Sequence, residues 1–300
     1  MNNTPKRDRV VVLGAGQLGT SLVEQAPKSV DVIPLSRTQC DITNAEQVER
    51  AIAETRPNAI LNATAYTAVD QAESDRVGAF AVNQQGVHNL ADACARLSVR
   101  LIHVSTDYVF DGGTGRHVSE DDSTAPLGVY GESKLAGERV LSATPNLEWV
   151  VVRTAWLYSN QGRNFLNTML ELMSCRDSLN VVCDQVGSPT SALSLAVVLW
   201  RIVLANALRG VFHWTDAGVA SWYDFAIAIQ EEALSLGILN SRIPIAPILS
   251  DQYPTPARRP ACVLLDKTKL VAGLNVQPVH WRKRLQETLI QRAATSINLK

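Results

Sequence analysis

Short apolar runs rich in β-branched residues alternate along the chain with stretches whose apolar residues recur at helical spacing. The predicted strands cover residues 9–14, 30–36, 58–64, 99–106 and 148–156, and the predicted helices lie near 17–26, 45–55, 76–97 and 131–143. Strands that are apolar almost throughout are typical of a parallel sheet with helices on both faces. The pattern therefore predicts an α/β protein with a doubly wound, Rossmann-like sheet.

The alternation continues in the second half, with strands near 179–184 and 210–215 and helices near 191–206 and 221–236. Five prolines between residues 244 and 260 exclude a long helix there and favour extended or turn structure. We therefore predict a Rossmann-like domain over residues 1–156. Residues 157–300 are predicted to add the remaining sheet elements and a smaller C-terminal substrate-binding lobe.

Charge and cysteine content narrow the range of partners. The chain has 28 Lys and Arg against 29 Asp and Glu, so neither nucleic acid nor an anionic membrane is an expected partner, and a small molecule is. Its five cysteines are scattered without a CxxC pair, so neither a disulfide framework nor a zinc site is predicted. No apolar signal region precedes the first strand and no apolar run is long enough to span a bilayer. We expect a soluble, cytoplasmic protein.

Three glycines follow the first predicted strand in GxGxxG spacing, namely Gly14, Gly16 and Gly19. In a dinucleotide site the first permits the tight turn, the second lets the backbone approach a pyrophosphate, and the third lets the helix pack closely on the sheet. The motif alone is weak because glycine-rich turns are common. Its position between a strand and a helix favours dinucleotide binding over an ordinary tight turn.

The end of the second predicted strand indicates which dinucleotide would bind. An acid there would bond the ribose 2′-hydroxyl, whereas an arginine would accept a 2′-phosphate. Ser36 and Arg37 stand at that place, so we predict NADPH, with NADH as a possible second cofactor. Asp41 and Ile42 follow and would border the adenine. Alternatively, Asp41 caps the helix predicted near 44–55.

Tyr130 and Lys134 are four residues apart and therefore share one face of a predicted helix. A tyrosine and a lysine at this spacing also occur by chance on exposed helix faces, so the pair alone is weak. The helix follows the fourth strand, which ends at Thr106 and Asp107, on the sheet edge where open α/β folds bind ligands. Gly131 and Ser133, between the pair, are expected to be surface filler.

These residue types match the reduction of a ketone by a nicotinamide. The developing alkoxide needs a proton, which a phenol can donate if a nearby cation lowers its pKa. Tyr130 would be the donor and Lys134 the cation, which could also hold the nicotinamide ribose. The Thr106 hydroxyl would hydrogen-bond the substrate oxygen.

From residue 9 to about 285 the chain resembles the extended short-chain dehydrogenase/reductase superfamily and, within it, the dTDP-4-dehydrorhamnose reductases. The segments that carry the resemblance, besides the glycine turn, are ILNATAYTAVDQAE (60–73), VNQQGVHNLA (82–91), STDYVFDG (105–112), APLGVYGESKLAGE (125–138), VVRTAWLY (151–158), NFLNTML (164–170), DQVGSPTS (184–191) and SWYDFA (221–226). The resemblance implies reduction of the 4-keto group of a dTDP-linked 6-deoxyhexose, most simply dTDP-4-dehydro-L-rhamnose, by NADPH or NADH.

The resemblance also implies roles for individual residues. Tyr130 would be the proton donor, Lys134 its partner, and Thr106 a substrate ligand. The residues implied for the cofactor are Gly16, Gln17 and Leu18 at the pyrophosphate, Asp41 and Ile42 at the adenine, and Ala63, Thr64, Ala65 and Tyr66 along its length. Asp107 and Trp156 would contact the sugar nucleotide, although Trp156 could instead be a core aromatic. Trp222 is expected to pack in the core, and no histidine is assigned a role.

At some positions the chain differs from related families, and some questions of function and assembly stay open. Related dehydratases carry Asp-Glu after the threonine, and Asp107-Tyr108 here lacks the second acid, which speaks against dehydration. Some rhamnose-pathway reductases hold an interfacial Mg²⁺ with carboxylates where this chain has Ser21 and Leu193, so no metal is expected. The sequence leaves open the oligomeric state, a homodimer included. Also open are reduction of a different nucleotide-linked deoxysugar and a regulatory, NADP-binding role like that of methionine adenosyltransferase β-like relatives.

Overall fold

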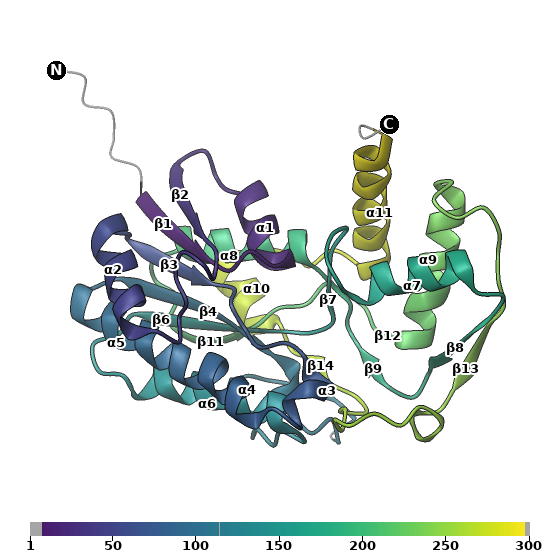
Figure 1. Ribbon diagram of the computed structural model, residues 1–300, viewed down its shortest axis with the longest axis horizontal. Helices are drawn as coiled ribbons and strands as arrows, with labels where there is room; N and C mark the ends of the chain where they lie inside the picture. The colour runs from purple at the N-terminus through teal and green to yellow at the C-terminus, as the bar shows by residue number, and fades with distance from the viewer. Residues whose placement is uncertain (1–7, 114, 298–300) are drawn as a thin grey trace.

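The computed structural model describes residues 8–113 and 115–297. A six-stranded parallel sheet forms its larger part (Figure 1). In spatial order the strands are β11 (Gly210–His213), β6 (Trp149–Thr154), β4 (Arg100–Thr106), β3 (Ala59–Asn62), β1 (Asp8–Leu13) and β2 (Val30–Leu35). The doubly wound sheet and all five strands predicted in the first half of the chain are confirmed.

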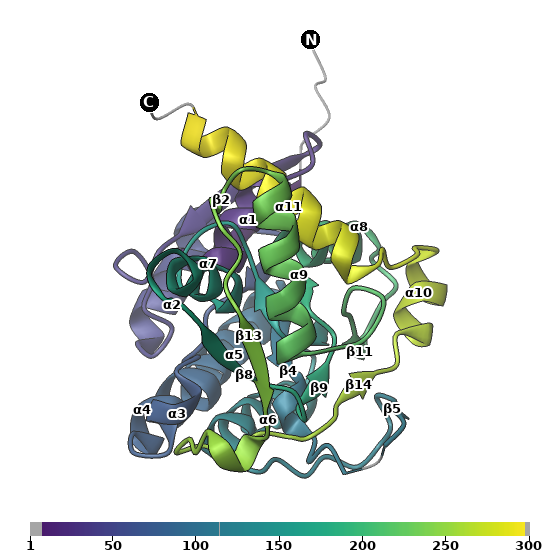
Figure 2. The same ribbon diagram turned by 90° about the vertical axis from the view of Figure 1, so that its right-hand side faces the viewer.

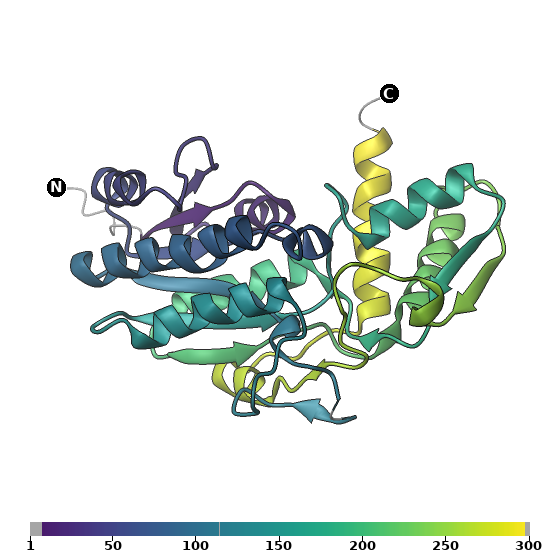
Figure 3. The same cartoon turned by 60° about the horizontal axis from the view of Figure 1, so that its bottom comes forward.

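The two faces of the sheet are covered by different helices because successive strand residues point to opposite sides. Val10 and Val12 belong to the apolar cluster formed with α1 (Gln17–Glu24) and α8 (Ala192–Leu204). Val11 and Leu13 belong to the cluster on the other face. The helices on that second face are α2 (Ala45–Thr55), α5 (Val87–Leu97) and α6 (Val129–Ala143), of which α5 and α6 lie side by side in Figure 3.

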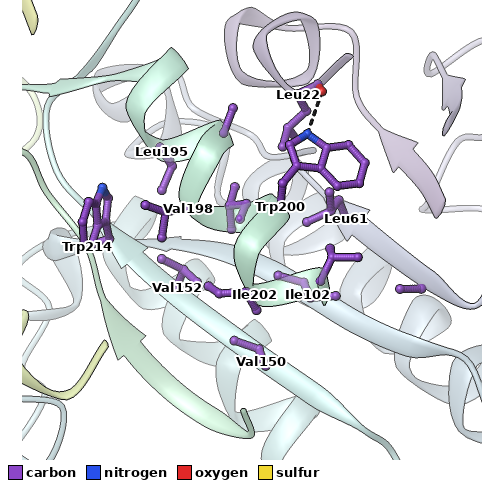
Figure 4. Packing of buried hydrophobic residues seen from close by; sticks show 14 of the residues in the cluster. Leu22, Leu61, Ile102, Val150, Val152, Leu195, Val198, Trp200, Ile202 and Trp214 are labelled. Carbon is purple, nitrogen blue, oxygen red and sulfur yellow. Dashed lines mark hydrogen bonds between the residues drawn. The ribbon is translucent and has the colours of Figure 1, made fainter. Parts of the chain in front are cut away.

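One buried indole ties the first face together. Trp200 of α8 is 2 % exposed, and its Nε1–H donates to the carbonyl oxygen of Leu22 in the last turn of α1 at 2.8 Å (Figure 4). Carbonyls in the last turn of a helix lack an intrahelical partner, so this bond satisfies a buried acceptor. It fixes α1, and with it the glycine turn that precedes α1, against the sheet.

The stretch predicted as one helix near 76–97 is divided into α4 (Arg76–Phe80), a π-helical segment η1 (Ala81–Gly86) and α5. The Asn83 side chain, which η1 turns inward, bonds both the N–H and the carbonyl of Tyr66 and also Ser133 Oγ. A Cβ on Gly137 would lie 2.2 Å from the Asn83 carbonyl, so α6 and η1 pack backbone to backbone. The short helix α3 (Val69–Ala72) precedes α4.

A second group of elements lies beside the sheet (Figures 1 and 2). Its helices and main strand pair are α7 (Phe165–Cys175), α9 (Trp222–Ser235), α11 (Trp281–Ile297), β8 (Leu179–Val182) and β13 (Ile245–Ile248). They share an apolar core around Tyr158, Phe225 and Trp281. The predicted strand near 179–184 therefore belongs to this lobe, whereas the one near 210–215 joins the main sheet as β11.

The remaining described elements are short. They are η2 (Asp107–Val109), β5 (His117–Val118), β7 (Leu157–Tyr158), β9 (Val186–Gly187), β10 (Thr190–Ser191), β12 (Ala220–Ser221), η3 (Ser250–Gln252), β14 (Leu264–Leu265) and α10 (Thr268–Leu274). The proline-rich stretch forms β13, η3 and loops, as predicted. Within the described residues, no helix is both long and apolar enough to cross a membrane.

Candidate active site at the carboxyl edge of the sheet

A cleft of about 860 Å³ runs along the carboxyl ends of the main-sheet strands. Because β2 and β3 lie on opposite sides of β1, this edge contains the switch point where open α/β sheets bind ligands. The predicted site residues that line the cleft are Gly14, Gly16, Gln17, Leu18, Arg37, Asp41, Ile42, Ala63, Thr64, Ala65, Tyr66, Thr106, Asp107, Tyr130, Lys134 and Trp156. The other two predicted residues, Gly19 and Ser36, are not part of the lining.

The three glycines of the turn have different surroundings. Gly14 has φ +104°, a conformation that favours glycine, and its N–H bonds the carbonyl of Leu35. A Cβ on Gly19 would lie 1.8 Å from the Gly14 carbonyl oxygen, whereas a Cβ on Gly16 would meet no atom within 4 Å. Gly16 precedes the first turn of α1, has no side-chain cap and lies in the cleft. The open backbone at a helix N-terminus fits the pyrophosphate of a dinucleotide.

The first helix also contacts the second lobe through Gln17. Its amide nitrogen donates to the Leu157 carbonyl at 3.3 Å, and its amide oxygen accepts from Asn164 Nδ2 at 3.2 Å and Ser159 Oγ at 3.3 Å. Asn164 caps α7 by accepting from the N–H of Asn167. The bonds of Gln17 therefore link the predicted pyrophosphate turn to the loop that begins the smaller lobe.

The predicted ribose and adenine residues form a second set. The Arg37 side chain is 78 % exposed and its Nε donates to Asp41 at 3.1 Å. Burial raises the pKa of Asp41, but hydrogen bonds from Thr43 and Arg37 outweigh that effect and lower it overall. The alternative that Asp41 caps α2 is wrong, because Asn44 is the cap and accepts from the N–H of Gln47. Asp41 therefore keeps its negative charge at this end of the cleft, beside the guanidinium of Arg37.

Ser36 and Ile42 are positioned by the surrounding backbone. The Ser36 hydroxyl bonds Thr38 and Gln39 and so stabilises the turn after β2. Ile42 is 4 % exposed and packs against Gly86, where a Cβ would lie 2.6 Å from Ile42 Cδ1. The apolar side chain thus forms a fixed wall beside Asp41.

Thr106, Asp107 and Tyr130 form the centre of the cleft. Thr106 Oγ1 donates to Asp107 Oδ1 at 3.0 Å and accepts from the N–H of Tyr108 at 3.2 Å. Burial raises the pKa of Asp107 to about 7, against the lowering effect of the Thr106 and backbone hydrogen bonds. Burial also raises the pKa of Tyr130 to about 12, while the hydrogen bond with Thr106 opposes that rise. In this state the phenol of Tyr130 holds its proton firmly.

Lys134 is 1 % exposed and lies behind Tyr130 on α6. Its Nζ donates to the Val104 carbonyl at 2.7 Å and lies 3.0 Å from His103 Nε2. Burial lowers the pKa of Lys134 to about 8, although the charge of Glu138 works against the fall. Burial, and then the charge of Lys134, hold the pKa of His103 well below its usual value.

The expectation that Gly131 and Ser133 fill the helix surface is wrong. A Cβ on Gly131 would lie 2.2 Å from the Tyr108 carbonyl oxygen. Ser133 is fully buried and its hydroxyl accepts from Asn83 Nδ2 at 2.9 Å. Both small residues let α6 approach η1 and η2 closely enough to bring Tyr130 beside Thr106.

Two indole rings form the wall of the cleft on the side of the smaller lobe. Trp156 follows β6 and Trp222 begins α9, and the rings stack with centroids 3.5 Å apart and planes 3° apart. Trp156 has φ +47°, a conformation that is unusual for a bulky residue. Gly187 allows this arrangement because a Cβ there would lie 2.7 Å from the Trp156 ring. Trp222 thus lines the cleft as well as packing on Phe165, which the sequence did not indicate.

Sequence reasoning also missed residues that only the fold brings to the cleft. Arg163, in the loop before α7, lines the cleft. His103 and Asn62 lie buried beneath Lys134, and the interruption of an apolar strand by a histidine was the one available signal. Within residues 8–113 and 115–297, no three His, Cys, Asp or Glu side chains are grouped to hold a metal ion.

Comparison with known proteins shows the family of this chain. A family model described as the RmlD substrate binding domain matches residues 8–294. A dTDP-4-dehydrorhamnose reductase of Aggregatibacter actinomycetemcomitans is 41 % identical over 286 residues, covering 93 % of this chain and 97 % of the relative. The enzyme of that name from Mycobacterium tuberculosis is 42 % identical over 304 residues, covering 98 % and 96 %. A crystal structure of dTDP-4-dehydrorhamnose reductase from Bacillus anthracis in complex with NADP has a TM-score of 0.90 and 34 % identity, and covers 95 % of this chain and 100 % of that one.

Proposed function

Because this chain belongs to the dTDP-4-dehydrorhamnose reductase family, which the RmlD substrate binding domain defines, we propose that it reduces the 4-keto group of dTDP-4-dehydro-L-rhamnose. It is an NAD(P)H-dependent oxidoreductase. The observation that carries the assignment of residues is that Thr106, Tyr130 and Lys134 share one cleft with the glycine turn.

The cofactor would lie along the sheet edge. Gly16, Gln17 and Leu18 would hold its pyrophosphate, Asp41 and Ile42 its adenine, and Arg37 the 2′-phosphate of NADPH. The strip from Ala63 to Tyr66 would border its length. Bound NADPH supplies the hydride that the carbonyl carbon receives.

The chain's own residues supply the proton and the positioning. Tyr130 donates its phenolic proton to the substrate oxygen as negative charge develops there, and the Thr106 hydroxyl holds that oxygen in place. An ammonium at Lys134 favours the resulting phenolate. Burial and the charge of Asp107 raise the pKa of Tyr130 to about 12 against the lowering effect of the Thr106 hydrogen bond, so donation depends on a positive charge close by.

We further propose that residues 1–156 bind the cofactor, and that residues 157–300 complete the sheet and bind the sugar nucleotide. Asp107 and Trp156 are the substrate ligands assigned from the sequence. The stacked ring of Trp222 extends the flat apolar wall that a deoxysugar or a thymine would contact.

The test compares Tyr130→Phe with the wild type in an NADPH-oxidation assay. The variant is expected to lose a factor of about 10²–10⁴ in kcat while its Kd for NADPH, measured by calorimetry, is unchanged. Tyr253→Phe is the matched control, because Tyr253 is 61 % exposed on the proline-rich loop, and it should keep full activity. Full turnover by Tyr130→Phe would refute the assignment of the proton donor.

The substrate is tested separately with dTDP-, UDP- and GDP-linked 4-keto-6-deoxyhexoses. The expected result is turnover of the dTDP-linked 4-dehydro-L-rhamnose, with the C4 configuration of rhamnose in the product by NMR. Tight NADPH binding without oxidation by any of these sugars would instead favour a binding role for the chain.

A further inference from the structure

A chain of buried hydrogen bonds connects Lys134 to the cleft lining on another strand. Lys134 Nζ lies 3.0 Å from His103 Nε2, and His103 Nδ1 lies 3.0 Å from Asn62 Nδ2. Asn62 Oδ1 accepts from the N–H of Thr64 at 3.1 Å and from its hydroxyl at 2.6 Å. His103 is fully buried and Asn62 is 1 % exposed, so no solvent competes for these bonds.

The positions of the protons follow from Thr64. A backbone N–H can only donate, so the atom of Asn62 that faces it must be the amide oxygen. The amide NH₂ of Asn62 therefore faces His103 and donates to Nδ1. Because Nδ1 must offer a lone pair, the neutral imidazole carries its proton on Nε2, the nitrogen that faces Lys134.

This tautomer restricts Lys134. An ammonium has three N–H donors and no lone pair, so it cannot accept from Nε2–H. A neutral amine can accept that bond and still donate to the Val104 carbonyl, which lies at 2.7 Å. The contact at 3.0 Å is therefore a hydrogen bond only if the lysine is uncharged.

We propose that His103 is a positioning residue that holds Lys134 as a neutral amine in the free protein, and that cofactor binding is accompanied by uptake of a proton at Lys134. The proton comes from solvent and forms one new N–H bond on Nζ, and the His103 bond is given up. This inference rests on the proposed function, because Lys134 needs its positive charge only when Tyr130 is to act as an acid.

No other charged group described around Lys134 supplies Tyr130 with the positive charge that a neutral lysine lacks. Among the titratable and charged groups on the elements packed around it are His103 on β4, Asp107 and Tyr108 in η2, Arg153 on β6, and Tyr130, Glu132 and Glu138 on α6. Glu73, which ends α3, and Arg76, which begins α4, lie near the first turn of α6. Glu138 lies four residues after Lys134 on α6, and Arg153 binds it through Nε at 3.0 Å and Nη2 at 2.7 Å. Glu73 bonds the Val129 N–H and Arg76 bonds the exposed Glu132.

The first test reads the tautomer directly in the free protein. Histidine side-chain nitrogens are observed by ¹⁵N NMR in the apo wild type, and His103→Gln identifies the signals by their loss. We expect Nε2 to carry the proton and Nδ1 to be unprotonated at pH 9, where Lys134 is uncharged. A proton on Nδ1 would overturn the inference whatever the catalytic behaviour of the protein.

The second test counts protons taken up with the cofactor. Calorimetry of NADPH binding at pH 9, above the pKa of about 8 to which burial lowers Lys134, in buffers of different ionisation enthalpy should show uptake of about one proton by the wild type. His103→Gln places an amide oxygen that can accept from an ammonium, so its uptake should fall to nearly zero. The pH above which kcat/KM for NADPH falls should also rise by about one unit in this variant.

The controls separate this inference from the proposed function. His213→Gln removes another fully buried histidine, one that contacts Arg153 instead of Lys134, and should leave proton uptake unchanged. If His103→Gln does not fold, His103→Asn is used in its place, and the wild-type measurements still decide the matter. No uptake by the wild type overturns the inference, whereas full activity of Lys134→Met overturns the role of the lysine in the proposed function.

Discussion

Replacing Gly16 and Gly19 by alanine should separate cofactor binding from folding within a single turn. A Cβ at Gly19 would lie 1.8 Å from the Gly14 carbonyl oxygen, so α1 would have to recede by roughly 1.5 Å to reach ordinary contact. Trp200 and the sheet oppose that movement, since they fix α1 from the other side. Overpacking of this kind costs about 1–3 kcal/mol, and the better helix propensity of alanine returns up to about 1 kcal/mol.

We therefore expect Gly19→Ala to lose about 2 kcal/mol of unfolding free energy, which corresponds to a fall of roughly 0.7 M in the urea midpoint. Gly16→Ala adds a methyl group where no atom lies within 4 Å, so it should cost no more than about 1 kcal/mol through the weaker N-cap. The same methyl group occupies the space through which the backbone approaches the pyrophosphate. The Kd of Gly16→Ala for NADPH should therefore rise about tenfold or more.

Urea unfolding followed by circular dichroism, together with calorimetric titration of NADPH, measures both quantities. The reasoning fails if Gly19→Ala is as stable as the wild type, because the close approach of α1 to the turn would then not be required. It fails equally if Gly16→Ala binds NADPH with unchanged affinity, because the pyrophosphate would then lie elsewhere.

Two further predictions concern charges that line the cleft. Arg37→Ala should raise KM for NADPH about tenfold and leave KM for NADH unchanged, because only NADPH has the 2′-phosphate that the exposed guanidinium would bind. Equal effects on both cofactors would contradict this role. Asp107→Asn should change the pH dependence of stability. Because burial raises the folded-state pKa of Asp107 to about 7, the wild type loses stability as the pH rises from about 4 through 7. The variant has no ionisable carboxyl at this position and does not lose that stability. Thermal unfolding at pH 5 and pH 8 should show the variant gaining on the wild type at the higher pH, and parallel curves would refute the burial of an ionisable carboxyl.

Most of the elements that build the cleft were predictable because their signals are local. The strand before Gly14, the helix after it and the helix that carries Tyr130 and Lys134 each follow from apolar periodicity over a short window. The break of the helix near residue 81 by a π-helical segment was not predictable. It depends on the packing of Asn83 against Tyr66 and Ser133, which come from other parts of the chain.

The sequence by itself determined the α/β class, the glycine turn and the position of Thr106, Tyr130 and Lys134 at one edge of the sheet, because strand order and helix spacing fix which residues can meet there. Only the tertiary structure decided what lies behind them. His103 and Asn62 are 41 positions apart and become partners because β3 and β4 are neighbours in the sheet. Trp156 and Trp222 stack because Gly187 leaves room for an indole beside β9. The hydrogen-bond partner of a buried polar group depends on which strands and helices pack around it and exclude water. Residue spacing along the chain does not determine that packing.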